Sequence, residues 1–600
     1  MKQNYHTIVI GSGCAGFNAA DWLYDLGIKD IAVVTEGINM GTSRNTGSDK
    51  QTYYKLTLAG DEADSVYEMA TTLFEGGSVH GDTALIEAAC STKAFMKLVN
   101  LGLPFPTNRY GAYVGYKTDH DPRQRATSCG PLTSKLMTES LEVAVKSKGI
   151  QILDHCQVVK LLKSNNCVCG LALLDTTTKE YRVLNCQNVI LATGGPAGIY
   201  ENTVFPQSQT GGTGLALEAG AASCNLQEWQ YGLASVDFRW NVSGTYQQVL
   251  PKYISVDDNG QEHEFLLDYF NTQHEALDMV FLKGYQWPFD VRKIEGSSRI
   301  DQIVATEINE KGRTVYMDFR YNPLELDFGK LSEETYTYLE RSEALFGTPI
   351  QRLAKMNQKA IDLYMNNGID LYNEPLKVAV CAQHCNGGIA VDANWESTVK
   401  GLYVVGEAAG TFGVYRPGGS ALNAAQVGAM RAAEHIAHKK TSTKNLLGTD
   451  VSATFSPSAI TYGKHSTSKT NHIAAQKRMS QYAAYVRDID EMQKLREELL
   501  HTKQNFFEEN VVVSKEELPD LHKHYDALVT QIEVLSSMLF AAKEIGSRGS
   551  ALVKDAVFDT GKFKDYVVTT QDGKAFFEQI RSLPLCDDWF ETVWNAFSSR

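Results

Sequence analysis

The sequence lacks any run of about 18 apolar residues, the minimum for a helix that crosses a membrane. It also lacks a block of lysine and arginine, and its formal net charge is -14. This charge suits neither nucleic acid nor an anionic membrane surface as the main partner. The first residues, MKQNYH, lead directly into a predicted strand with no apolar targeting segment. We therefore expect a cytoplasmic protein with no membrane span and no nucleic-acid partner.

Paired cysteines are also absent, because the eleven Cys residues form no CxxC motif. An odd number of scattered thiols is typical of reduced side chains rather than of a disulfide framework. Cys381, His384 and Cys385 lie within five residues on a predicted strand, and no CxxC or HxxxH motif complements them elsewhere. Their side chains cannot all converge on one ion, so we predict no metal site.

The chain is too long for a single hydrophobic core. It has 600 residues, of which 43% are apolar, so several compact units are expected. We find no internal repeats and no low-complexity tract. The sequence therefore predicts a multidomain protein.

Three glycines mark the first motif that carries chemistry. In IVIGSGCAGFNAADWLYDLG, residues 8–27, they separate a β-branched strand from a helical pattern. Gly11 permits a tight turn, Gly13 lets the backbone approach a pyrophosphate, and Gly16 lets the helix pack against the strand. The next predicted strand, IAVVTEG, brings Glu36 20 residues after Gly16, where an acid binds a ribose hydroxyl. This context predicts a dinucleotide site.

The order of the following segments favours FAD over NAD. A long polar stretch follows Glu36, and the strands in QILDHCQVVKLL and CVCGLALLD then alternate like a meander before QNVILATGG. This layout is typical of FAD-binding flavoproteins. No second GxGxxG precedes a strand and an acid, so no built-in NAD(P)H site is expected. Electrons must then reach or leave the protein by another route.

Two later motifs carry a family resemblance. At LATGG (residues 191–195) and GLYVVGEAAG (residues 401–410) the chain resembles the flavoprotein subunit family of fumarate reductase and succinate dehydrogenase, which includes aspartate oxidase. GVYRPGGSALNAAQVGAMRAAEHI is similar to the family helix whose N-terminus approaches the flavin ring. Free N–H groups at such a helix start suit negative charge on a reduced flavin.

The resemblance implies an α/β fold with a Rossmann-like FAD-binding domain, an inserted α+β capping domain and a C-terminal helical domain. We place the FAD-binding domain at residues 1–235 and 346–440, the capping domain at 236–345 and the helical domain at 441–600. A Ser/Thr-rich connector at 439–458 precedes helical sequence. There Met492, Leu495 and Leu499 mark one apolar face, and a seam from Leu521 to Leu539 marks another.

The turn and the resemblance together give a set of expected cofactor-binding residues. They are Gly11, Gly13, Cys14, Ala15, Gly16, Glu36, Thr42, Ser43, Ala192, Thr193, Gly194, Gly406, Glu407, Ser420, Ala421 and Leu422. GTSRNTGSDK lacks the histidine to which some family members attach the flavin, so we expect non-covalent FAD.

The resemblance also implies catalytic residues. In the family, hydride passes between flavin N5 and a carbon of a small dicarboxylate that cationic side chains hold. Arg416 falls at a family substrate-binding arginine, and its planar fork suits a carboxylate. Tyr415 beside it would bind a carbonyl or take part in proton transfer. A family histidine is replaced by Gln383, with His384 one place later, and only Lys252 lies near the expected position of the acid arginine.

The leading prediction is a FAD-dependent oxidoreductase that acts on a carbon–carbon bond next to a carboxylate or carbonyl of a small-molecule substrate. Two alternatives stay open. One is amine oxidation of the aspartate oxidase kind. The other is a flavin-containing electron-transfer subunit that docks a partner protein.

Overall fold

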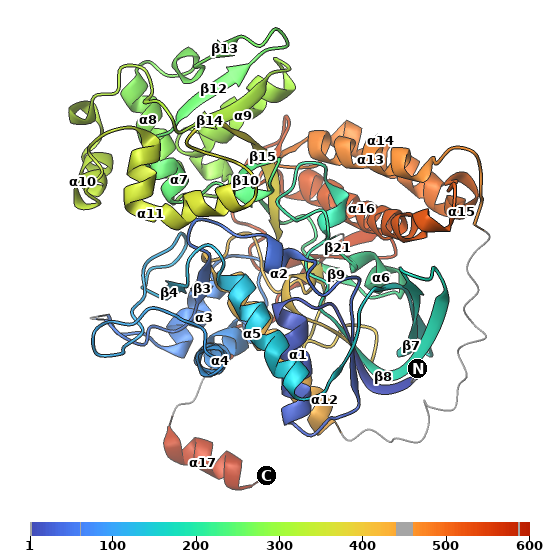
Figure 1. Cartoon of the computed structure of the whole chain (residues 1–600). Helices are drawn as coiled ribbons and strands as arrows, with labels where there is room; N and C mark the ends of the chain where they lie inside the picture. The colour runs from blue at the N-terminus through green and yellow to red at the C-terminus, as the bar shows by residue number, and fades with distance from the viewer. Residues whose placement is uncertain (1–2, 61, 210, 440–459, 586–588, 600) are drawn as a thin grey trace.

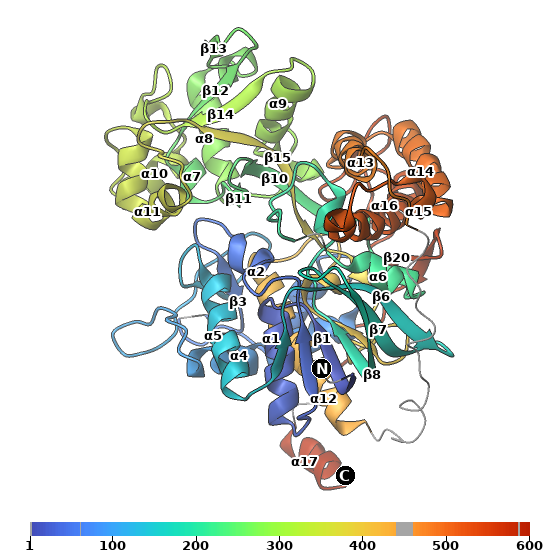
Figure 2. The ribbon, with the colours of Figure 1, turned by 45° about the vertical axis from the view of Figure 1, so that its right-hand side comes forward.

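The computed structural model describes residues 3–60, 62–209, 211–439, 460–585 and 589–599. Figure 1 shows the capping elements in green and yellow above a blue and cyan body, with the orange C-terminal helices beside them. Figure 2, turned by 45°, shows the same three groups of elements from another side. No helix among the described residues is long and apolar enough to span a membrane.

The body is built on a seven-stranded sheet of order β5-β2-β1-β8-β7-β6, with β17 also paired to β8. Parallel pairing joins β5, β2, β1, β8 and β17, whereas β8, β7 and β6 form an antiparallel meander. Both faces of the parallel part are covered, so its strands are continuous apolar runs. The bounds are β1 (Asn4–Ile10), β2 (Ile31–Val34), β5 (Gln151–Leu153), β6 (Cys156–Ser164), β7 (Cys167–Asp175), β8 (Tyr181–Leu191) and β17 (Leu402–Val404).

Helices cover this sheet and place glycine-rich turns at its edge. Helix α1 packs against α12 and α5, and α12 also packs against α4. Their bounds are α1 (Cys14–Asp25), α4 (Gly81–Asn100), α5 (Thr133–Ser147) and α12 (Ser420–His438). Short helices α2 (Thr42–Asn45) and α6 (Thr213–Glu218) lie in the connections. The predicted strand, turn, helix and strand at the start of the chain are all present.

The capping elements surround a six-stranded sheet of order β11-β10-β15-β14-β12-β13. Its strands are antiparallel, and aromatic and aliphatic side chains from the sheet and α11 share one core. The strands are β10 (Trp229–Ser235), β11 (Trp240–Asn241), β12 (Lys252–Val256), β13 (Glu262–His263), β14 (Thr314–Asp318) and β15 (Leu376–Cys385). The helices are α7 (Thr245–Gln248), α8 (Gln273–Lys283), α9 (Ser298–Asn309), α10 (Glu333–Arg341) and α11 (Pro349–Asn366). Strands β10 and β15 extend this sheet outside residues 236–345.

The C-terminal part begins with the predicted helices and ends with a β-hairpin and a last helix. Met492, Leu495 and Leu499 of α14 are buried, as are Leu521, Leu528, Ile532, Leu535 and Leu539 of α16, so both apolar seams are internal packing. The helices are α13 (Ser468–Tyr482), α14 (Ile489–Gln504), α15 (Phe506–Glu509), α16 (Leu518–Glu544) and α17 (Phe590–Ser598). Strands β20 (Tyr566–Gln571) and β21 (Lys574–Gln579) join β9 (Ser223–Cys224) and β16 (Gly388–Ile389) in a four-stranded sheet. From residue 440 on, the predicted connector lies outside the described residues.

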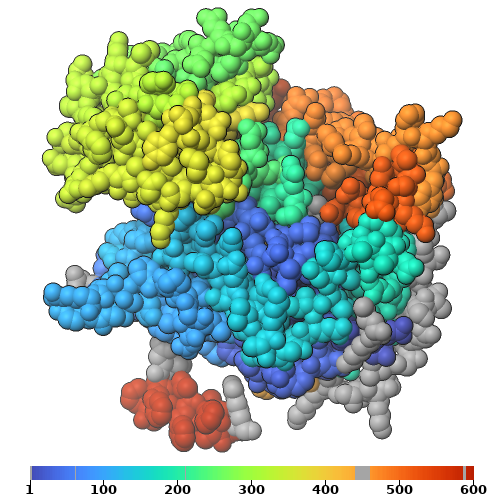
Figure 3. Space-filling model, viewed as in Figure 1, coloured from blue at the N-terminus to red at the C-terminus, as the bar shows by residue number. Residues whose placement is uncertain are grey.

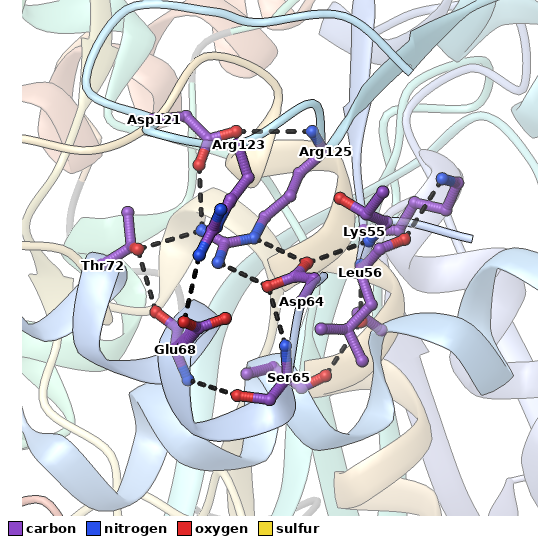
Figure 4. Close-up of polar contacts among 12 residues, drawn as sticks. Lys55, Leu56, Asp64, Ser65, Glu68, Thr72, Asp121, Arg123 and Arg125 are labelled. Carbon is purple, nitrogen blue, oxygen red and sulfur yellow. Dashed lines mark hydrogen bonds and ion pairs between the residues drawn. The ribbon is translucent and has the colours of Figure 1, made fainter. Parts of the chain in front are cut away.

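A buried arginine ties together the loops beside the cofactor-binding body. Arg125, next to β4 (Ala126–Ser128), is fully buried and forms ion pairs with Asp64 at 2.7 Å and Asp121 at 2.9 Å (Figure 4). Its guanidinium also donates to Thr72 of α3 (Val66–Phe74). The loop fixed in this way ends near α12, where the Thr118 hydroxyl donates to the carbonyl oxygen of Gly418 at 3.3 Å. The network therefore supports the turn that starts α12.

Candidate active site

The predicted motifs meet at one edge of the parallel sheet. Strands β1, β2, β8 and β17 end at Ile10, Val34, Leu191 and Val404, and a motif follows the carboxyl end of each. Parallel strands end on the same side of a sheet, which is where such folds bind their ligands. Segments that lie up to about four hundred residues apart in the chain therefore line one cavity.

The first glycine turn is held by close backbone packing. Gly11 has φ of 110°, and a Cβ there would overlap the carbonyl oxygen of Ala192. A Cβ on Gly16 would likewise overlap the carbonyl oxygen of Gly11. Helix α1 begins after Gly13 without a side-chain cap. The N–H of Cys14 donates to the Ser43 hydroxyl at 3.2 Å, so the N–H groups that follow it at the start of α1 are the ones suited to an anion.

Most of the expected cofactor-binding residues line this cavity. They are Gly11, Gly13, Cys14, Ala15, Glu36, Thr42, Ser43, Ala192, Thr193, Gly194, Gly406, Glu407, Ala421 and Leu422. Gly16 lies outside the lining because it packs the helix on the strand. Ser420 is buried, and its hydroxyl donates to the carbonyl oxygen of Pro417 at 2.7 Å. Gly16 and Ser420 therefore lie behind the residues that line the cavity.

Sequence reasoning missed three residues that the structure brings to the same site. Gln51 and Gln209 line the cavity, and the Gln209 side-chain oxygen, Oε1, accepts from the backbone N–H of Thr42 at 2.7 Å. Lys523 of α16 forms an ion pair with Glu36 at 3.1 Å. No motif in the sequence surrounds these side chains, because they come from loops and from a separate helix.

The lining residues fit a flavin dinucleotide. The Thr193 hydroxyl has no hydrogen-bond partner among the described residues, although it is buried beside the cavity. One side of the cavity offers the N-terminus of α1 for a pyrophosphate, and Glu36 lies at the end of β2 for a ribose. Helix α12 starts after Gly419, whose φ is 89°, without a side-chain cap. The N–H groups of Ser420 and Leu422 donate to the carbonyl oxygens of Pro417 and Gly419. The positive end of the helix dipole, rather than a set of free N–H groups, suits the negative charge of a reduced flavin ring.

Three of the expected catalytic and cofactor residues converge where β15 meets the turn after β17. The Glu407 carboxylate accepts from the backbone N–H of Cys385 at 3.0 Å, and its oxygen lies 4.0 Å from the His384 Nε2 atom. Burial raises the pKa of Glu407 to about 7, and nearby Arg416 opposes that shift. Burial likewise lowers the pKa of Arg416 to about 10. The cluster thus joins an acid, a base and a cation.

Arg416 is held ready for a ligand. Its Nη2 atom donates to Gln230 Oε1 at 2.6 Å, and its Nη1 atom lies 3.5 Å from the Ser420 hydroxyl. The Nε atom is buried and has no partner among the described residues. An arginine fixed on one side and unsatisfied on the other can bind a carboxylate. Gln230, on β10, is a further residue that the motifs did not indicate.

His384 follows a β-bulge in β15, where Gln383 has no partner residue on β10. Gln383 faces the capping elements, where its side-chain oxygen accepts from Trp287 Nε1 at 2.8 Å. His384, one residue on, points toward Glu407. Its Nδ1 atom lies 3.0 Å from Asn386 Oδ1, and its Nε2 atom has no hydrogen-bond partner among the described residues. Burial and the charge of Arg416 hold the pKa of His384 well below its usual value, so the ring is neutral at pH 7.

Tyr415 forms one of the contacts between the body and the capping segment. Its hydroxyl donates to Asp290 Oδ1 at 3.4 Å, and the guanidinium of Arg292 lies 3.7 Å from the centre of its ring. Asp290 also holds Arg292 in an ion pair of 2.7 Å. Burial and the charge of Asp290 raise the pKa of Tyr415. The phenol is therefore protonated at neutral pH and links two parts of the fold.

The structure does not bring Lys252 to this cluster. Lys252 lies on β12, two strands away from β15 in the capping sheet, and its ammonium group pairs with Glu264 at 3.4 Å. The sequence places Lys252 near the expected position of the acid arginine, and nothing in it indicates this separation in the fold. Among the described residues no group of three or more His, Cys, Asp and Glu side chains is placed to hold a metal.

This fold and cavity define a dinucleotide-binding protein of the flavoprotein class. The first turn is suited to a phosphate, and the turn after β17 with the start of α12 forms a second wall of the cavity. The chain belongs to the FAD binding domain family, whose model matches residues 6–422. FAD is its cofactor, and the prediction of a FAD-dependent oxidoreductase is confirmed.

Known proteins support this assignment. The chain is 25% identical over 443 residues to L-aspartate oxidase of Xylella fastidiosa, covering 72% of this chain and 75% of that protein. It is 24% identical over 430 residues to a subunit of the fumarate reductase (CoM/CoB) of Methanothermobacter marburgensis, covering 71% of each. The structure matches FrdA of an E. coli quinol fumarate reductase with a TM-score of 0.73 at 18% identity, covering 98% of both chains. The predicted α/β fold is thereby confirmed.

Proposed function

We propose that the chain transfers hydride between FAD and a carbon next to a carboxylate or carbonyl group. The observation that carries this proposal is the convergence of Arg416, His384 and Glu407 at one end of the cofactor cavity. Bound FAD supplies the two-electron chemistry. The chain itself must bind the substrate, orient it and exclude water.

Particular residues are suited to binding the substrate, to orienting it and to excluding water. The Arg416 fork binds the substrate carboxylate, and Gln230 keeps that fork in one orientation. His384 is neutral, and because its Nδ1 atom donates to Asn386 Oδ1, its Nε2 atom can accept a hydrogen bond without adding a second cation. Tyr415 and Asp290 connect the body to the capping segment, whose closure would exclude water from the reacting carbon. The positive end of the α12 dipole stabilises negative charge beside them.

The finer features of the proposal follow from the sequence. We place the cofactor residues as the motifs predict and hold FAD without a covalent bond. We keep the predicted range of 236–345 as the centre of the capping domain and add β10, α11 and β15, which share its sheet or its core. The substrate is a small unsaturated acid or enone, or its saturated form. A partner protein would exchange electrons with the flavin, because no second dinucleotide motif is present.

Amine oxidation is a second candidate, and the similarity to L-aspartate oxidases favours it. The same arginine would hold the carboxylate of an amino acid, and the Nε2 atom of the neutral His384 would accept a hydrogen bond from the amine. The two candidates differ in which form of the flavin the substrate changes. An unsaturated acid oxidises the reduced flavin, whereas an amino acid reduces the oxidised one.

The test uses the FAD-loaded protein, reduced by light without oxygen and mixed with a panel of unsaturated acids and enones. Return of the flavin band at about 450 nm with one compound supports the reductase. Arg416→Gln should abolish that return while leaving bound FAD. Arg478→Gln on α13 is the matched control, because that guanidinium pairs with Glu498 away from the cavity. If no compound restores the band, and L-aspartate bleaches the oxidised protein instead, amine oxidation replaces the first proposal.

A further inference from the structure

Arg416 differs from the other buried cations of the chain because no carboxylate of the described residues forms an ion pair with it. Five cationic side chains in the described part of the chain have a buried nitrogen atom with no hydrogen-bond partner, namely Arg44, Lys97, Lys283, Arg416 and Arg548. Carboxylates pair with the other four. Arg416 alone therefore keeps both its charge and a free donor for a ligand.

The other cations of the neighbouring segments are already engaged. Arg292 and Lys293 of the capping segment form ion pairs at 2.7 Å and 3.3 Å. Arg239, which follows β10, and Arg487 donate to backbone carbonyl oxygens at 2.9 Å and 2.5 Å. Within the described part of the chain, this end of the cavity thus offers one cation, Arg416, to a negatively charged ligand.

A neutral amide lies beside the same stretch of β10 as Arg416. Gln383 Nε2 is buried and has no hydrogen-bond partner among the described residues, while Gln383 Oε1 accepts from Trp287 Nε1 at 2.8 Å. A Cβ on Gly232 of β10 would lie 2.9 Å from that Nε2 atom, so the amide lies directly over Gly232. Gly232 and Gln230, which holds Arg416, are two residues apart and share one face of β10 at a separation of roughly 7 Å. A short-chain acid can span that separation.

A carboxamide suits these groups better than a second carboxylate does. The green and yellow capping part lies directly against the blue and cyan body (Figure 3), and the free atoms of Arg416 and Gln383 are buried. A carboxylate beside Gln383 would lose water without gaining a cation, which is costly, and the charge of Glu407 would oppose it. A carboxamide oxygen can accept from Gln383, and its N–H groups can donate to an acceptor such as His384 Nε2, which a carboxylate cannot do.

We propose that the substrate bound here carries one carboxylate, held by Arg416, and one neutral carboxamide, held by Gln383. This inference rests on the hydride transfer proposed above and names the substrate class of the same site, a small unsaturated acid amide with a single negative charge. It departs from the small dicarboxylate that the family resemblance implies. The departure falls on Gln383, which replaces a family histidine, so Gln383 is the residue that determines specificity.

The test measures binding to the FAD-loaded protein in its oxidised state, so it does not depend on turnover. Each acid is titrated at neutral pH, and the shift of the flavin absorption gives its dissociation constant. The probes are fumaric acid monoamide, fumarate, and crotonate, a monoanion with a methyl group in place of the carboxamide. The monoamide should bind at least about tenfold more tightly than either of the other two.

Variants of the amide separate the effect of charge from that of hydrogen bonding. Gln383→Leu should bring the monoamide to within about threefold of crotonate, because the donor is lost. Gly232→Ala should act in the same direction, since the atoms nearest to the new Cβ belong to the Gln383 amide, which must move aside. Gln383→Arg adds a second cation and should make fumarate bind more tightly than the monoamide. Gln358→Leu, at an exposed glutamine of α11, is the matched control and should leave the preference unchanged.

Fumarate that binds as tightly as the monoamide would overturn the proposal, because a second cation would then have to reach the site. A preference that survives Gln383→Leu would overturn it too, as would the absence of binding by all three acids. The photoreduced protein separates this proposal from the proposed function. If the monoamide binds as expected but does not restore the flavin band, hydride transfer to it fails while the class of ligand stands.

Discussion

Replacing Glu36 by glutamine should weaken FAD binding by about tenfold to about a hundredfold. Hydrogen bonds to a charged acceptor contribute about 1.5 to 3 kcal/mol, and each 1.4 kcal/mol is about a tenfold change in affinity. Glu36 follows β2 and lines the cofactor cavity, where its carboxylate would accept from the ribose hydroxyls. Glutamine keeps the shape of the side chain and removes its charge.

The same change should leave the fold almost as stable as before. Glu36 pairs with Lys523 at 3.1 Å, and their side chains are 27% and 18% exposed. A pair this open to solvent contributes about 0 to 1 kcal/mol. Loss of the pair therefore cannot account for a large change in affinity. Lys523→Met, which removes only the partner of the acid, should weaken FAD binding by no more than about fivefold.

The assay titrates the FAD-free protein with FAD and follows the quenching of flavin fluorescence. Glu218→Gln is the control, because Glu218 binds the Tyr525 hydroxyl at 2.7 Å on the neighbouring α6 and does not line the cavity. A dissociation constant that changes less than about threefold in Glu36→Gln would refute the contact with the ribose. An equal change in the control would show that the effect is general.

Three further changes test the fold and the site. Gly11→Ala should abolish FAD binding, measured from the flavin content of the purified protein, because φ is 110° and the new Cβ would overlap the Ala192 carbonyl; normal loading would contradict the close approach. Arg125→Met should lower the free energy of unfolding in urea by about 3 to 5 kcal/mol, because it leaves the buried carboxylates of Asp64 and Asp121 unpaired; a loss below about 1 kcal/mol would show that the network is dispensable. Glu407 has a pKa raised from 4.5 to about 7, so its protonated form stabilises the FAD-free fold below its unfolded-state pKa, and this contribution is lost as the pH rises to about 7. The free energy of unfolding should therefore fall as the pH rises toward 7, and Glu407→Gln should reduce this dependence by up to about 1.4 kcal/mol per pH unit. An unchanged dependence would mean that Glu407 is already charged in the folded protein.

The cofactor half of the site could be predicted because its signals are local. A glycine between a strand and a helix has few structural alternatives when a second strand and an acid follow at the right distance. The same holds for the apolar seam of α16, whose spacing alone indicated a buried helix. The expected position of Lys252 had no such local signal, and the structure places that residue elsewhere.

The sequence by itself determined the dinucleotide turn, and its family resemblance implied the fold, the cofactor and the segments that meet around it, since the conformation of a glycine turn depends on a few neighbouring residues. Only the tertiary structure decided which distant side chains complete the site. Gln230 holds Arg416 across 186 residues of chain, and Lys523 reaches Glu36 from a helix in the C-terminal part. His384 faces Glu407 just after a β-bulge at Gln383, where its partner on β10 is Gln230. Contacts of this kind depend on how the elements pack, and packing leaves no pattern along the chain.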